Sequence, residues 1–348
     1  MQLIRRQYHL IIASLVLLSV PPLGAGEPAI RIVTTTSDLA SIAREVAGDL
    51  ADVQALCTGK EDPHFVQARP GLILAARKAD LWIRIGMDLE IGWEGPVLDG
   101  SHNPAIREGQ RGHLDASADV LRLEVPTQKV SREFGDVHPQ GNPHYWLDPY
   151  NGRVVARTIA DRLAVLFPAK AAQFQANLQR FQRALDERMF GQDLVGQVDP
   201  NDLWHHQIDG TLDTFLPDKG KAQALGGWVA AMRPLRGQKI VTYHRSWVYF
   251  AHRFGLEVAA ELEPKPGIPP SAGHLAKVTD LVRQLQIKQI LQEPFYSPKA
   301  GRRVAEQTGA NLVIVANSVG GEKEATDYLA LMDLIVRRIT ENSTGARP

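Results

Sequence analysis

The stretch "AKAAQFQANLQRFQRALDERMF", residues 169–190, decides how the rest of the chain is interpreted. It contains no Gly or Pro, and Pro168 separates it from an earlier helical stretch. A helix over these residues would reach about 33 Å at 1.5 Å per residue. That length matches the span of a small domain, so the stretch predicts a rigid strut.

Strand and helix patterns alternate on the N-terminal side of the strut. The predicted strands cover residues 29–36, 52–58 and 80–86, with predicted helices at 37–50 and 70–79. Residues 93–140 are rich in Gly, Pro and charge, and predict loops with one short strand near 120–125. A further helix is predicted at 148–167, with Asp148 as N-cap and Pro149 at its first position, the order that helix starts favour.

The same alternation resumes on the C-terminal side. Strands are predicted at 238–244, 257–263, 288–294 and 311–317, and helices at 274–287, 300–309 and 327–342. Strands alternating with helices indicate parallel sheets covered on both faces. We therefore expect an α/β fold of two lobes, at residues 27–165 and 191–348, joined by a long rigid helix at 166–190. The pattern does not place the elements of residues 191–227.

The N-terminus has the three parts of a secretory signal peptide, predicted over residues 1–26. Arg5 and Arg6 precede an apolar run over residues 10–20, and small residues follow it. The run is too short to span a bilayer, which takes about 20 residues. No Cys follows it, so we expect a cleaved product without a lipid anchor in an exported compartment.

Composition and charge argue for a soluble globular protein and against a nucleic-acid partner. Hydrophobic residues make up 44% and charged residues 22%, as in a soluble globular protein. Without the two arginines of the signal peptide, 39 − 2 = 37 Lys and Arg face 39 Asp and Glu. A nucleic-acid partner usually requires a basic face, so none is expected. The single Cys57 excludes an internal disulfide.

Polar residues gather where the predicted parallel strands end. His244, Glu293 and Asn317 end strands of the second lobe, and His64 follows the second strand of the first. Ligands bind at the carboxyl ends of such strands. His144 stands behind Pro143 in "NPHYWLDP", residues 142–149. Three imidazoles and a carboxylate suit Zn²⁺ and its neighbours, whereas oxygen-rich sets favour manganese or magnesium.

Four segments carry a family resemblance: "EDPHFVQARP" (61–70), "NPHYWLDP" (142–149), "VTYHRSWVYFAHRFGL" (241–256) and "EPFYSP" (293–298). In this order the chain resembles, over nearly its whole mature length, the cluster A-I (cluster 9) solute-binding proteins of zinc and manganese ABC transporters. The resemblance implies two α/β lobes, a metal between them, and His64, His144 and His244 as ligands. It also implies a zinc-type member, since manganese members tend to carry a glutamate in place of His244.

The fourth ligand is where the chain departs from the family pattern. Many relatives place an aspartate at the position that matches Asn317, and a neutral amide is a poor zinc ligand. Glu293 is predicted as the fourth metal ligand, with an orienting role for Glu293 or a bound water as the alternatives. The long His-rich loop of some zinc members is absent. His138 is predicted to lie in a surface loop, with guarding of the cleft mouth or weak metal binding as the alternatives. His205 and His206 are predicted to lie in a solvated loop, with metal capture as the alternative.

The predicted function is capture of a divalent metal, Zn²⁺ before Mn²⁺, and its delivery to an ABC transporter permease in the periplasm. The first alternative is a manganese or iron binder of the same type, and the less favoured one is a zinc metallohydrolase. The sequence lacks HExxH, GxSxG and P-loop motifs, so no enzymatic activity is expected. No catalytic residue or resident cofactor is predicted, and the protein is expected to be a monomer.

Overall fold

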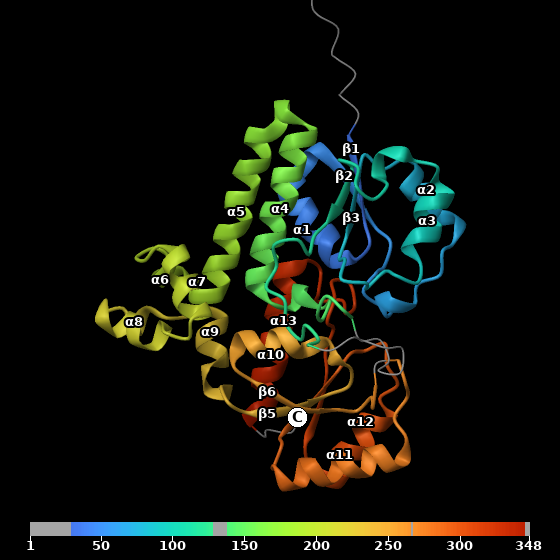
Figure 1. Ribbon diagram of the computed structural model, residues 1–348. Coiled ribbons are helices and arrows are strands. Elements are labelled where there is room, and N and C mark those ends of the chain that lie inside the picture. The colour runs from blue at the N-terminus through green and yellow to red at the C-terminus, as the bar shows by residue number, and fades with distance from the viewer. Residues whose placement is uncertain (1–28, 128–137, 266, 345–348) are drawn as a thin grey trace, which may run out of the picture.

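The computed structural model describes residues 29–127, 138–265 and 267–344, and it contains two four-stranded parallel sheets (Figure 1). The first has the order β2-β1-β3-β4 and the second β6-β5-β7-β8. The strands of the first sheet are β1 Ile30–Thr34, β2 Ala51–Ala55, β3 Leu81–Arg84 and β4 His113–Asp115. Those of the second are β5 Lys239–Thr242, β6 Glu257–Glu261, β7 Gln289–Gln292 and β8 Asn311–Ile314. The predicted two-lobed α/β fold is confirmed.

Helices cover both faces of the first sheet. Helix α1 (Ser37–Ala47) packs on one face, and α2 (Pro70–Arg77) with α3 (Glu94–Ser101) packs on the other. Thr36 caps α1 by accepting a hydrogen bond from the backbone of Leu39. Side-chain oxygens at this position satisfy an N–H group that the helix leaves free.

The strand predicted near residues 120–125 is wrong, and the edge strand of the first sheet is β4 instead. The backbone groups of this segment are bound by side chains from elsewhere. The N–H of Leu121 donates to the Asn151 side chain at 2.9 Å, and that of Leu123 to the Tyr249 hydroxyl at 3.0 Å. Backbone groups already satisfied in this way are not available for a strand ladder.

Two long helices, α4 (Pro149–Leu166) and α5 (Ala171–Phe190), stand side by side against the first lobe (Figure 1). Asp148 caps α4, as predicted, by accepting from the backbone of Tyr150 at 2.9 Å. Helix α5 has 20 residues and buries a stripe at spacings of three and four: Phe174, Leu178, Phe181, Leu185. Because this stripe is buried in the hydrophobic core, α5 is packed along its length and does not stand free as a strut.

The segment that the sequence left unplaced contains α6 (Gln192–Val195), α7 (Pro200–Ile208) and α8 (Leu212–Asp218), followed by α9 (Gly227–Met232). Trp204 of α7 donates its indole N–H to Asp186 of α5 at 2.6 Å. Gly227 has a φ of +59°, and a Cβ there would meet the Arg188 carbonyl oxygen at 2.2 Å. Helices α6, α7 and α9 are therefore held by contacts with α5, and α8 packs against α7.

The remaining helices cover the second sheet. They are α10 (Val248–Phe254), α11 (Ala272–Gln284), α12 (Lys299–Thr308) and α13 (Tyr328–Glu341). Helices α11 and α12 pack on one face, and α10 and α13 on the other. The last helix, α13, reaches back to the first lobe, because the backbone N–H of Tyr328 donates to Ser41 of α1 at 2.8 Å.

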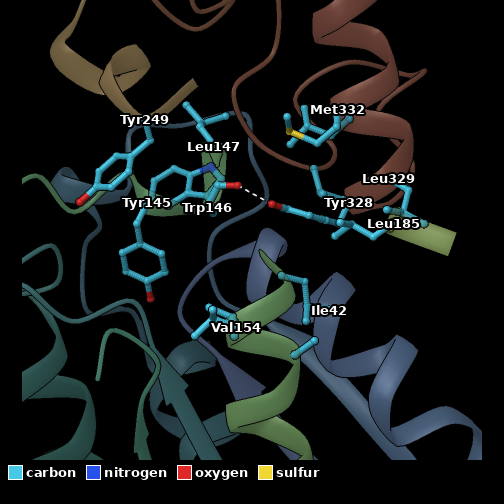
Figure 2. Close-up of a cluster of buried hydrophobic side chains, with 14 of the residues drawn as sticks. Ile42, Tyr145, Trp146, Leu147, Val154, Leu185, Tyr249, Tyr328, Leu329 and Met332 are labelled. Carbon is cyan, nitrogen blue, oxygen red and sulfur yellow. Dashed lines mark hydrogen bonds between the residues drawn. The ribbon is translucent and has the colours of Figure 1, made fainter. Parts of the chain in front are cut away.

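One hydrophobic core runs through both lobes. Figure 2 shows its centre, where Trp146 lies between side chains of α1, α4 and α13, and the Tyr328 hydroxyl donates to the Trp146 carbonyl at 2.7 Å. A close-packed core resists sliding of its parts. The lobes are therefore held together by more than one helix. The predicted boundaries at residues 165 and 190 stay predictions, since this core crosses both.

Within the described ranges, no helix combines the length and the apolar content needed to cross a membrane. The predicted signal peptide, residues 1–26, lies outside the described residues.

Candidate metal centre

Three of the four predicted ligands lie together between the lobes. One donor atom each from His64, His144 and His244 lies within 4.8 Å of the other two. The ring centroids of the pairs are 5.2 to 5.6 Å apart. His64 follows β2 and His144 precedes α4, while His244 follows β5 of the second sheet. Both lobes therefore contribute imidazoles to one point.

His64 and His144 are held by the same local motif. In Asp62-Pro63-His64, the Asp62 Oδ1 accepts from the His64 backbone N–H at 3.0 Å and lies 2.7 Å from its ring Nδ1. In Asn142-Pro143-His144, the Asn142 Oδ1 makes the same two contacts at 3.0 and 2.9 Å. An oxygen acceptor at Nδ1 places the proton there and leaves the Nε2 lone pair for a metal.

His244 has an equivalent partner from another strand. Its Nδ1 lies 2.7 Å from Oε2 of Glu263, which follows β6, and both side chains are buried. A carboxylate on the far nitrogen fixes the ring and raises its basicity as a ligand. All three histidines thus present Nε2 to the centre.

The orienting residues Asp62, Asn142 and Glu263 were missed by the sequence reasoning. The signal for the first two was present, since an Asx-Pro-His tripeptide occurs at both positions. An Asp or Asn side chain readily bonds the backbone two residues on. Glu263 has a weaker signal, its place two residues beyond the end of β6.

The pKa values of His144 and His244 are shifted in opposite directions. Burial lowers the pKa of His144 well below its usual value, and the charges of His244 and His64 add to this. Burial also acts on His244, but the hydrogen bond to Glu263 and the charges of Glu293 and Asp62 outweigh it and raise the pKa of His244. His144 is therefore a free base near neutral pH, whereas His244 holds a proton more firmly than an ordinary histidine.

Polar contacts between the lobes brace the centre. The Tyr296 hydroxyl donates to Asp62 Oδ2 at 2.7 Å, so that one carboxylate links the second lobe to His64. The guanidinium of Arg245 pairs with Glu124 at 2.8 Å, and the Arg245 carbonyl accepts from the Asn142 amide at 2.8 Å. The orientation of the ligands in the first lobe therefore depends on the second.

Glu293, the fourth predicted ligand, lies at the end of β7 and is fully buried. Its Oε1 accepts a hydrogen bond from the Ser246 hydroxyl, and its Oε2 has no hydrogen-bond partner within the described part of the chain. Burial raises the pKa of Glu293 to about 7. The backbone carbonyl of Asn317 accepts from the Trp146 indole at 2.8 Å, whereas its side-chain Oδ1 has no hydrogen-bond partner among the described residues. Neither residue belongs to the group of three donors.

His138 lies against the centre, in a position that the sequence reasoning did not favour. Its Nε2 is 3.2 Å from Nε2 of His64, and the ring centroids are 5.3 Å apart. His205 and His206 lie on α7, where His205 is 70% exposed and His206 bonds Thr211. Of the other histidines considered, His138 is the one that touches a predicted ligand.

Comparison with known protein families gives a match over most of the chain. A profile of the family described as "Zinc-uptake complex component A periplasmic" matches residues 32–189 and 219–342. The chain belongs to this family. The predicted family of periplasmic solute-binding proteins is thereby confirmed, and the matched ranges include all four predicted ligands.

Relatives in this family carry names that refer to different metals. The chain is 24% identical to the iron-binding protein YfeA of Yersinia pestis over 318 residues, covering 89% of this chain and 85% of that protein. It is 25% identical to the high-affinity zinc uptake system protein ZnuA of Brucella abortus over 206 residues, which span 59% of this chain and about half (50%) of that relative. The zinc-binding protein AdcA of Streptococcus pyogenes is 24% identical, with 92% of this chain and 57% of AdcA covered.

Solved structures share the fold. A crystal structure of ZnuA superposes with a TM-score of 0.66 at 21% identity, covering 90% of this chain and 98% of that one. A manganese-bound periplasmic metal-binding protein from Candidatus Liberibacter asiaticus gives 0.62 at 19% identity, covering 89% and 98%. At these identities the likeness shows the fold alone.

Proposed function

We propose that this protein captures a divalent metal ion, with Zn²⁺ as the preferred cargo, and delivers it to an ABC transporter permease. The observation that carries the proposal is the convergence of His64, His144 and His244, each with an oxygen acceptor on Nδ1. Free Nε2 atoms from both lobes offer a preformed site, and preformed ligands lose less entropy on binding.

The donor set favours zinc over manganese. Imidazole nitrogen suits Zn²⁺, whereas Mn²⁺ prefers sites rich in carboxylate and carbonyl oxygen. Asp62, Asn142 and Glu263 bond the Nδ1 atoms of the rings rather than the centre. Manganese and iron remain the alternative cargo, because YfeA is named an iron-binding protein.

We infer binding rather than catalysis. A catalytic zinc keeps an open position for water next to a general base. Here His144 and His244 are 4% and 5% exposed, and the nearby acid Glu293 bonds Ser246. The sequence predicts Glu293 as the ligand at the fourth position, with a bound water as the alternative. The same proposal includes export through a signal peptide at residues 1–26, residence in the periplasm without a lipid anchor, and a monomeric state.

A competition titration on the purified mature chain tests this function. Zn²⁺, Mn²⁺ and Fe²⁺ are each titrated against a chromophoric chelator, and the metal content is measured independently. Tight binding of one Zn²⁺ per chain, with Mn²⁺ much weaker, is the expected result. A preference for Mn²⁺, or no tight binding of any of the three ions, would contradict the assignment.

Zinc affinity should fall steeply as the pH is lowered through the neutral range. Only the neutral imidazole ligates, and the raised pKa of His244 means that its proton competes with zinc at a higher pH than an ordinary histidine, whose pKa is about 6.5. Below the pKa of His244 we expect the affinity to drop about tenfold per pH unit. Chelator competition between pH 5.5 and 8 measures this.

Glu263→Gln is the matched control for the pH series. It removes one negative charge that holds the His244 proton, so the fall in affinity should begin at lower pH. An affinity that does not change between pH 8 and 5.5 in the unmodified protein would show that His244 is not a ligand.

A further inference from the structure

We propose that His138, rather than Glu293, is the fourth ligand and that the cargo is held by four imidazoles. The inference rests on the proposed function and names the chemistry of its site. His138 is joined to the centre by a direct contact, since its Nε2 lies 3.2 Å from the Nε2 of His64. The hydrogen bonds of Glu293 include one from Ser246 and none from the three histidines.

The distance between the two nitrogens fits a shared zinc ion. Two ligands of a tetrahedral zinc with Zn–N bonds of 2.0–2.1 Å lie about 3.3 Å apart. The separation of 3.2 Å between His64 and His138 is close to that value. The two rings are tilted by 33°, with centroids 5.3 Å apart, so they meet at their edges rather than stacking.

The proton positions support a metal between these atoms. Asp62 accepts at Nδ1 of His64, so the His64 Nε2 carries a lone pair. The Nε2 of His138 faces this atom at 3.2 Å. A His138 ring that carries its proton on Nδ1 would present a second lone pair there, and both nitrogens would then bind one cation.

His138 also interacts electrostatically with the other histidines of the centre. It stands outside the group of three whose donors all lie within 4.8 Å, but its charge acts on His144, and those of His64 and His244 act on it. Four-coordination by imidazoles would therefore require the His138 ring to move toward these neighbours. Because none of the four donors would be a carboxylate, the site would lack the oxygen that Mn²⁺ prefers.

The experiment counts imidazoles on the bound metal. The mature chain is loaded with one equivalent of Zn²⁺, and X-ray absorption at the zinc edge gives the number of imidazole ligands, in parallel with chelator competition. The variants are His138→Ala and Glu293→Gln, and His205→Ala on α7 is the matched control. We expect four imidazoles in the unmodified protein and in Glu293→Gln, and three in His138→Ala with at least about tenfold weaker binding.

Three imidazoles and an oxygen in the unmodified protein, unchanged by His138→Ala, would overturn the inference while leaving the proposed function in place. Loss of the oxygen ligand in Glu293→Gln would then assign the position to Glu293. A chain that binds no stoichiometric zinc would overturn both the proposed function and the four-imidazole site. Since the count on the unmodified protein is decisive, the test does not depend on a variant that folds.

Discussion

Replacing His144 with Ala should lower the affinity for Zn²⁺ by more than about 100-fold. Loss of a residue that only orients a metal ligand costs 10–100-fold, and His144 is proposed to bind the metal itself. Its Nδ1 is fixed by Asn142 and its pKa is lowered by burial. Its ring therefore needs neither reorientation nor loss of a proton before it binds a metal. The measurement is the chelator competition at pH 7.5.

The fold should survive this replacement. His144 lies in the turn before α4, and its ring contacts Trp146 at a centroid distance of 5.2 Å. Deleting the ring leaves a small cavity, which is expected to lower the free energy of unfolding by about 1–3 kcal/mol. His205→Ala, at an exposed position of α7, should change neither quantity. An unchanged zinc affinity in a folded His144→Ala protein would remove His144 from the site.

The alternation of strands and helices was enough to predict the fold, because the strands are short apolar runs that end at polar residues. Strands β5, β7 and β8 lie inside the predicted ranges, and His244, Glu293 and Asn317 stand within three residues of their carboxyl ends. The rule that ligands gather at the carboxyl ends of parallel strands is geometric, so it holds without knowledge of the side-chain packing.

The unpredicted parts depend on contacts distant in sequence. Residues 120–125 have the composition of a strand, but Asn151 and Tyr249 bind their backbone groups. The short helices α6 to α8 are below the length at which helices persist alone. Helices α6 and α7 are held by contacts with α5, and α8 by contacts with α7. His138 touches His64 across 74 residues, a pairing that no local pattern signals.

The core that joins the lobes limits how the cargo leaves. Trp146, whose ring centroid lies 5.2 Å from that of the proposed ligand His144, packs with Tyr328 in a core common to both lobes (Figure 2). A wide opening of the cleft would break that core. Release by local movement around the ligands disturbs fewer contacts. The links from Tyr296 to Asp62 and from Arg245 to Glu124 are such local contacts, and both lie beside orienting groups.

Replacing Arg253 with Ala should lower the free energy of unfolding by about 3–5 kcal/mol, the usual loss when one partner of a buried ion pair is removed. Arg253 of α10 makes two hydrogen bonds of 2.7 Å to Asp148, the N-cap of α4, and the side chains are 2% and 0% exposed. Its guanidinium also lies 5.6 Å from the centre of the Tyr150 ring. The variant leaves the Asp148 charge buried without its partner, and urea unfolding measures the loss.

Arg188→Ala is the matched control, because Arg188 also pairs with an acid of another helix, Asp333, but both side chains are more than 40% exposed. An exposed pair of this kind contributes under about 1 kcal/mol. The double variant Arg253→Ala with Asp148→Asn should lose less than the sum of the two single variants, since it removes the charges together. If Arg253→Ala were as stable as Arg188→Ala, the buried pair could not be what holds α10 against the start of α4. Asp148 would then act only as the cap of that helix.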